Sequence, residues 1–179
     1  VMKIVPDVEN QDEVLEAILE PVRLAAINLD EMRVAEGKKL EKDLLERGEV
    51  IKGFVAEISE RAPSVPKEYA ERLKQRIATI LEDSTLASEE RIAVEAAIFA
   101  DKCNIDEEIT RLNSHMEQMK KIIYENGEPD GKRLDFLVQE MNREANTIGS
   151  KANDLSITER MLKIKAEVEK IREQVQNIE

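Results

Sequence analysis

The most regular stretch of the sequence is residues 156–178, which read SITERMLKIKAEVEKIREQVQNI. The large apolar residues in it recur in alternating steps of four and three: Ile157, Met161, Ile164, Val168, Ile171, Val175 and Ile178. These steps place them along one side of an α-helix about 33 Å long, as in a seam packed against other helices. We predict that this seam is buried in a hairpin or bundle, with an intermolecular coiled coil as the alternative.

Helical spacing of apolar residues covers nearly all of the remaining chain, without clean strand alternation. A second seam consists of Leu15, Ile18, Val22, Ala25, Leu29 and Met32, and Pro21 within it predicts a kink or a helix start. The pattern continues to Ile58, where Pro63 and Pro66 end the helix, and residues 69–81 are expected to return as a helical hairpin.

Further helices are predicted over residues 88–124 and 134–149, separated by a loop at 126–131 that contains two Gly and a Pro. Ser156 and Glu159 have the spacing of a capping box at the start of the last helix. We therefore predict an all-α fold. A long helical hairpin over residues 1–90 precedes a C-terminal helical bundle with coiled-coil-like seams over residues 91–179.

Composition excludes several classes of function. The formal net charge of −12 disfavours a basic nucleic-acid-binding surface, and five aromatic residues disfavour base stacking. Cys103 is the only cysteine, so neither a disulfide framework nor a zinc finger can form. Without an apolar run of about 20 residues or a signal-peptide start, we expect a cytoplasmic protein that does not contact membranes.

Residues 131–154 differ from the rest in being rich in Asn, Thr, Ser and Arg, which suits directed hydrogen bonding more than helix formation. At helical spacing, Glu140, Arg143, Glu144, Thr147 and Lys151 share one side. The two carboxylates could share a divalent cation beside basic groups that bind phosphate. A solvated ladder of ion pairs is the alternative.

The only histidine, His115, is the second candidate. Arg111 and Glu108 precede it by four and seven residues, so all three lie on one edge of a helix. Histidine can ligate a metal or transfer a proton near neutral pH. A lone histidine with a structural role is the alternative.

Four blocks carry a resemblance to a known family: residues 99–108 (FADKCNIDEE), 111–115 (RLNSH), 132–151 (KRLDFLVQEMNREANTIGSK) and 169–179 (EKIREQVQNIE). In this order they closely resemble the C-terminal region of the YicC/YloC family. The resemblance implies a bacterial endoribonuclease that uses a divalent cation, Mg²⁺ or Mn²⁺, and acts on RNA rather than DNA. It also implies a homo-oligomer, expected to be a hexamer.

On this resemblance, site residues are expected within the blocks. Glu140 and Glu144 would hold the cation with Glu108 or Asp135, and His115 would be a ligand or proton donor. RNA phosphates would contact basic and amide side chains: Arg111, Lys132, Arg133, Asn142, Arg143 and Lys151. Members of the family carry an N-terminal α/β domain ahead of the helices, and residues 1–8 resemble its last strand, so the chain is expected to be a fragment.

A non-catalytic helical scaffold or adaptor, which regulates small-RNA turnover through protein contacts, is the alternative function. Residues 101–154 contain eight basic and twelve acidic side chains, so this region has no basic surplus to attract RNA. Whether Glu140, Glu144 and His115 converge on one site would separate the two hypotheses.

Overall fold

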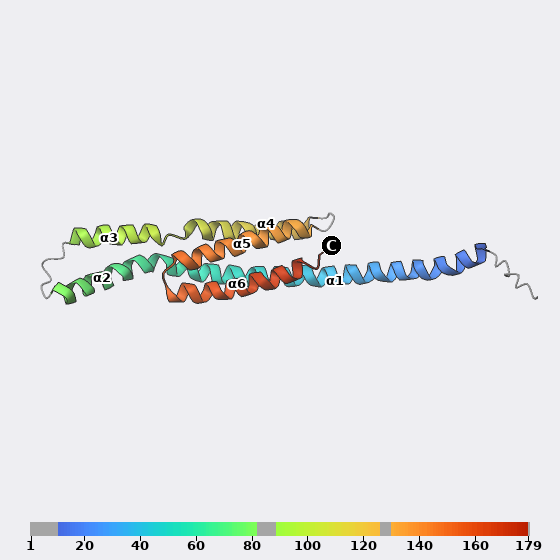
Figure 1. The fold of residues 1–179 in the computed structure, drawn as a ribbon, viewed down its shortest axis with the longest axis horizontal. Coiled ribbons are helices and arrows are strands. Elements are labelled where there is room, and N and C mark those ends of the chain that lie inside the picture. Colours follow the sequence, from blue (N-terminus) through green and yellow to red (C-terminus); the bar gives the residue numbers. More distant parts are fainter. Residues whose placement is uncertain (1–10, 82–88, 126–129, 179) are drawn as a thin grey trace, which may run out of the picture. The chain divides into compact units, whose positions relative to one another are not determined.

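The computed structural model describes residues 11–81, 89–125 and 130–178, and all regular secondary structure in these ranges is helical. The prediction of an all-α fold is confirmed. The elements in chain order (Figure 1) are α1 (Gln11–Arg61), the 3-10 turn η1 (Ala62–Ser64), α2 (Val65–Leu81), α3 (Glu89–Lys102), α4 (Asp106–Tyr124), α5 (Gly131–Lys151) and α6 (Leu155–Val175). None of the helices in the described ranges is both long and apolar enough to cross a bilayer.

The chain divides into two compact units, one up to Lys42 and one from Asp43 onward. In the first unit, the predicted seam of α1 is exposed. Its large members are 55–69% exposed: Leu15, Ile18, Val22, Leu29 and Met32. Pro21 lies inside the helix, where it cannot donate a backbone hydrogen bond. The predicted division into domains at residue 90 stays a prediction.

The second unit has a single hydrophobic core to which α4, α5, α6 and the C-terminal part of α1 contribute. The seam of α6 from Ile157 to Val175 is buried, each member being at most 2% exposed. The adjoining part of α1 contributes Leu44, Ile51, Val55 and Ile58. Buried apolar area of this kind is the main source of folding free energy. The shared core therefore holds α4 and α5 in a fixed arrangement with α1 and α6.

Ion pairs join α1 to α6 around this core. Arg47 donates to Glu167 at 2.9 Å, and Arg160 donates to Glu57 at the same distance. At the start of α6, the Asp154 carboxylate accepts from the Ile157 backbone N–H at 2.9 Å and from Arg61 at 2.8 Å. The helix cap is thus Asp154, not Ser156 as the sequence pattern predicts.

Two helix boundaries differ from the sequence prediction. The backbone at Arg61 and Val65 keeps right-handed helical angles, so α2 continues onward from α1 and does not return along it. A proline is tolerated in the first turn of a helix, since that N–H has no partner in any case. Instead, α3 packs alongside α2 (Figure 1). Tyr69, near the start of α2, stacks on Phe99, near the end of α3, with ring centroids 3.8 Å apart.

The helix predicted over residues 88–124 is broken at Cys103–Ile105, which separates α3 from α4. The side-chain oxygen of Asn104 accepts from the Asp106 backbone N–H at 2.9 Å. This local hydrogen bond competes with helix continuation, as Asn commonly does. Of the predicted loop at 126–131, residues 126–129 lie outside the described residues.

Candidate metal centre

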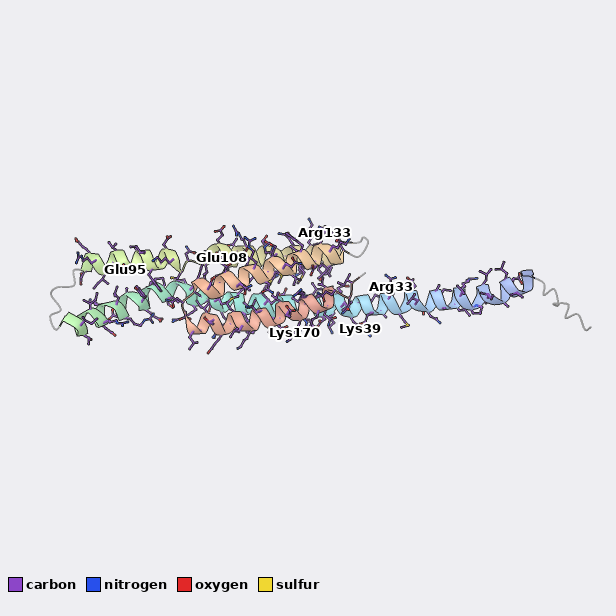
Figure 2. The ribbon with its side chains drawn as sticks, in the orientation of Figure 1. Arg33, Lys39, Glu95, Glu108, Arg133 and Lys170 are labelled. Carbon is purple, nitrogen blue, oxygen red and sulfur yellow. The ribbon has the colours of Figure 1, made fainter. Side chains whose placement is uncertain are left out.

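The candidate site lies along one edge of the antiparallel pair α4 and α5. Both helices bury an apolar stripe in the core, and polar residues next to the stripes meet where the helices touch. We call this line the polar edge; it consists of Glu108, Arg111 and His115 on α4 with Glu140, Glu144 and Lys151 on α5. Figure 2 shows Glu108 near the start of α4 and Arg133 near the start of α5, at opposite ends of the pair.

At the end of the polar edge where α4 begins and α5 ends, Lys151 donates to Glu108 Oε1 at 2.6 Å. Glu108 is only 5% exposed, and its second oxygen, Oε2, is buried without a hydrogen-bond partner among the described residues. Burial is the largest single influence on the pKa of this carboxyl and raises it. The hydrogen bond from Lys151, backbone hydrogen bonding and the nearby cations together lower the pKa by more. The pKa of Glu108 therefore lies below its ordinary value.

Arg111 lies one turn further along and bridges the two helices. It donates to Glu107 on its own helix, and its guanidinium Nη1 lies 3.7 Å from Glu144 Oε1. Half of the Arg111 side chain is exposed, so the guanidinium can reach a ligand at the surface. The carboxylate of Glu144 is thus near a cation without being hydrogen-bonded to it.

Beyond Arg111, His115, Glu140 and Glu144 come together. One ring nitrogen and one carboxylate oxygen from each glutamate lie within 4.8 Å of one another. Glu144 is 3% exposed, while His115 and Glu140 are half-buried. The Nδ1 atom of His115 is buried without a hydrogen-bond partner among the described residues. We call these three residues the His–Glu triad.

The burial and hydrogen bonding of the triad are consistent with a bound divalent cation. Glu144 is 3% exposed with the Arg111 guanidinium 3.7 Å from its Oε1, and the neighbouring His115 Nδ1 is buried without a hydrogen-bond partner among the described residues. Buried polar groups are ordinarily hydrogen-bonded, and buried ligating groups are hydrogen-bonded or metal-bound. Oxygen ligands about 2.1 Å from Mg²⁺ are at most about 4.2 Å apart, so a small side-chain rotation would close the triad around one ion.

The other predicted ligands do not join the triad. Asp135 accepts from Gln139 on its own helix at 2.7 Å, and Glu108 pairs with Lys151. Around an α-helix each residue advances about 100°, so Asp135 lies about 140° away from Glu140. Helical geometry therefore separates these two carboxylates.

The predicted phosphate-binding residues occupy three places. Arg111 and Lys151 lie on the polar edge, as described above. Asn142 accepts from Asn146 at 3.3 Å and, with Arg143, lines a hollow between α5 and α6. Arg143 also lies 3.7 Å from Glu140, the contact that an ion-pair ladder predicts. Lys132 and Arg133 line a second hollow, between α4 and α5.

The second hollow also contains residues that the sequence analysis does not nominate, namely Gln118, Lys121 and Phe136. Two of them could be recognised in the sequence by their helical spacing from the candidate residues. Gln118 follows His115 by one turn on α4, and Phe136 precedes Glu140 by one turn on α5. Extending the one-turn spacing from His115 and Glu140 would have found Gln118 and Phe136, but not Lys121, which lies six residues after His115.

The comparisons with known proteins assign the chain to a family. Residues 58–179 match the family model described as "Endoribonuclease YicC-like, C-terminal". The chain is 45% identical over its full length to a protein of Clostridioides difficile strain 630, and 33% identical over 96% of its length to one of Haemophilus influenzae. Both relatives are named "Probable endoribonuclease YicC", and the chain spans 61% and 60% of their lengths. These matches confirm the resemblance seen in the sequence blocks, and the chain belongs to the YicC-like endoribonuclease family.

Proposed function

We propose that this chain carries the cation-binding centre of an endoribonuclease, with His115, Glu140 and Glu144 as ligands. The buried Nδ1 atom of His115, which lacks a hydrogen-bond partner among the described residues and belongs to one cluster with the buried Glu144, is the observation that carries the proposal. The triad lies inside the segment that matches the family model, and two relatives are named as endoribonucleases. The substrate class is RNA.

The donor set favours Mn²⁺ over Mg²⁺, because imidazole suits transition metals whereas Mg²⁺ prefers an all-oxygen shell. When bound, the cation would supply Lewis-acid polarisation of a phosphodiester oxygen. Arg111 and Arg143 lie 3.7 Å from the two glutamates, with half or more of each side chain exposed. They can therefore hold phosphate oxygens next to the triad through charge-assisted hydrogen bonds.

Glu108 and Lys151 have a positioning role in this proposal. Their 2.6 Å pair ties α4 to α5 one turn from Arg111 and fixes how the two helices register. Neither is proposed as a cation ligand or a phosphate contact. The expected homo-oligomer, with six copies, remains a prediction.

The test is cation binding to the whole chain, measured by the loss of the free Mn²⁺ electron paramagnetic resonance signal. Glu144→Gln keeps the side-chain shape but removes the charge, and it should weaken Mn²⁺ binding by at least about tenfold. Glu173→Gln, on the exposed face of α6, is the matched control and should bind as the parent does. Equal binding by both variants would refute the assignment of the triad.

A non-catalytic scaffold is the second candidate, because large apolar residues of α1 in the first unit are exposed. Such a surface suits docking of a partner helix. Chelation separates the candidates. Labelled RNA should be cut by the full-length protein with Mn²⁺ and left intact with EDTA, whereas a scaffold leaves RNA intact in both.

A further inference from the structure

The hollow between α4 and α5 lies on the same side of the helix pair as the His–Glu triad. It has a volume of about 410 Å³, and its lining combines cations, an amide and apolar side chains: Gln118, Lys121, Ile122, Lys132, Arg133, Phe136 and Leu137. Phe136 is four residues before Glu140 and Arg133 is seven before it, about 6 Å and 10 Å along the axis. The hollow and the triad are therefore neighbours along one helix edge.

Three cationic side chains surround the hollow. Arg133 is 3.3 Å from Asp130 and 3.4 Å from Glu125, so its charge is largely balanced. Among the described residues, Lys121 and Lys132 lie within ion-pair distance of no carboxylate, and both are exposed. In a chain of net charge −12, two unbalanced lysines at one hollow form a local site for an anion.

Phe136 is 60% exposed in the same hollow. The other two phenylalanines have partners within the molecule, since Lys163 lies 5.5 Å above the ring of Phe54 and Phe99 stacks on Tyr69. Phe136 has no ring contact within the described chain. An exposed aromatic face beside cations is the arrangement by which single-stranded nucleic acids are held, with a base on the ring and phosphates on the cations.

We propose that this hollow is the subsite for the nucleotides next to the cleaved bond in a single-stranded RNA. A base stacks on Phe136, Lys121 and Lys132 contact the adjoining phosphates, and the strand continues along the polar edge to the triad. The proposal rests on the proposed function for the identity of the ligand. An acidic peptide would use the lysines but would gain less from a flat aromatic face.

Binding is tested without cleavage, by fluorescence anisotropy of a short labelled single-stranded RNA with the whole chain in EDTA. Phe136→Ala should weaken binding roughly tenfold, whereas Phe136→Tyr should bind as the parent does. Leu162→Ala is the matched control, because Leu162 is 63% exposed on α6 and should not affect binding. Circular dichroism establishes that each variant is folded.

The lysines are tested by salt dependence. Each phosphate contact on a single strand contributes about 0.7 to the slope of log K against log salt. Replacing Lys121 and Lys132 together with Gln should therefore lower the slope by about 1.4, while Lys165→Gln, an exposed lysine on α6, should leave binding to this RNA unchanged. An abasic strand bound by the parent protein should show the same affinity as intact RNA bound by Phe136→Ala.

Several outcomes would overturn the subsite: no binding by the parent at low salt, an affinity unchanged in Phe136→Ala, or an unchanged salt slope in the lysine variant. Displacement of the RNA by an acidic peptide at equal concentration would assign the hollow to protein instead. In EDTA no divalent cation is bound, so RNA binding by the parent chain reports on the hollow independently of the triad. A failure of the triad to bind Mn²⁺ is thus distinguishable from a failure of the subsite.

Discussion

The pair of Glu108 and Lys151 leads to a prediction about stability: removing the lysine should cost more than removing the glutamate. Lys151→Met removes the side-chain hydrogen bond to Glu108 Oε1, and the other oxygen of Glu108 has no hydrogen-bond partner among the described residues. Removing one member of a buried pair costs about 3–5 kcal/mol. Because Lys151 is 39% exposed and water can approach from its side, we reduce this to about 2 kcal/mol at pH 7.

The reverse substitution should behave differently. In Glu108→Met the lysine keeps access to water, and an apolar side chain replaces a buried charge, so the free energy of unfolding should change by less than about 0.5 kcal/mol. The double variant should regain most of what Lys151→Met loses. Arg172→Met, which breaks the exposed pair with Glu169, is the control and should cost less than about 0.5 kcal/mol.

The loss should also depend on pH. In the parent chain the pKa of Glu108 is lowered, so the stability from the pair is present above the unfolded pKa and is lost as pH falls through the folded pKa. Without Lys151, burial raises this pKa above the unfolded value of about 4.3. The penalty in Lys151→Met is then largest near neutral pH and shrinks as the medium is acidified.

The assay is urea unfolding followed by far-ultraviolet circular dichroism at pH 7 and pH 5. The free energy of unfolding is extrapolated linearly to zero denaturant. The reasoning is refuted if Lys151→Met matches the parent at pH 7, if its loss is equal at both pH values, or if the double variant does not recover. Each of these results would show that the Glu108 carboxylate is not the buried, partner-dependent charge that the contacts indicate.

Two further changes test the packing and the helix cap, each by thermal and urea unfolding. A Cβ on Gly131 would lie 2.6 Å from the Ile178 backbone oxygen, so Gly131→Ala should destabilise by about 1–3 kcal/mol; Gly149→Ala, with open space, should instead stabilise by up to about 1 kcal/mol. Asp154→Ala should cost about 1 kcal/mol through its cap alone. The hydrogen bond from Arg61 lowers the pKa of Asp154, so this contribution is present above the unfolded pKa and should disappear in strong acid. Equal stability of Gly131→Ala and Gly149→Ala would contradict the packing assignment. A loss in Asp154→Ala that persists in strong acid would contradict the role of the charged cap.

Apolar spacing was sufficient to predict the core of the C-terminal bundle. The residues that step by four and three along α6 are the ones the structure buries, because a seam of this period can face only one side. The same reasoning applied to α1 identifies its apolar residues but not what covers them, and within the first unit they are exposed. Apolar periodicity identifies which side of a helix is apolar, but it does not identify the element that packs against that side.

The triad required information that periodicity lacks. His115 on α4 and the two glutamates on α5 were nominated separately, and their convergence depends on the register between antiparallel helices. That register also brings Lys151 opposite Glu108, which turns a predicted ligand into half of an ion pair. Asp135 differs, since the angle around a single helix already separates it from Glu140 and the sequence alone could have excluded it.

Counts of charges and aromatics describe the whole chain and do not specify the charge of one local surface. The net charge of −12 sums over exposed helix faces, whereas an approaching strand responds mainly to charges within a Debye length of about 8 Å. In the proposed site, the lysines of the hollow lie beside a triad that holds two carboxylates. A divalent cation there would cancel the charge that repels phosphate, so cation and RNA should each raise the affinity of the other by the same factor. At about 10 Å in water a pair of unit charges interacts by only about 0.4 kcal/mol before screening. The coupling should therefore be a few-fold, enough to favour a loaded centre when RNA is bound but too small to make the cation indispensable for binding at the hollow.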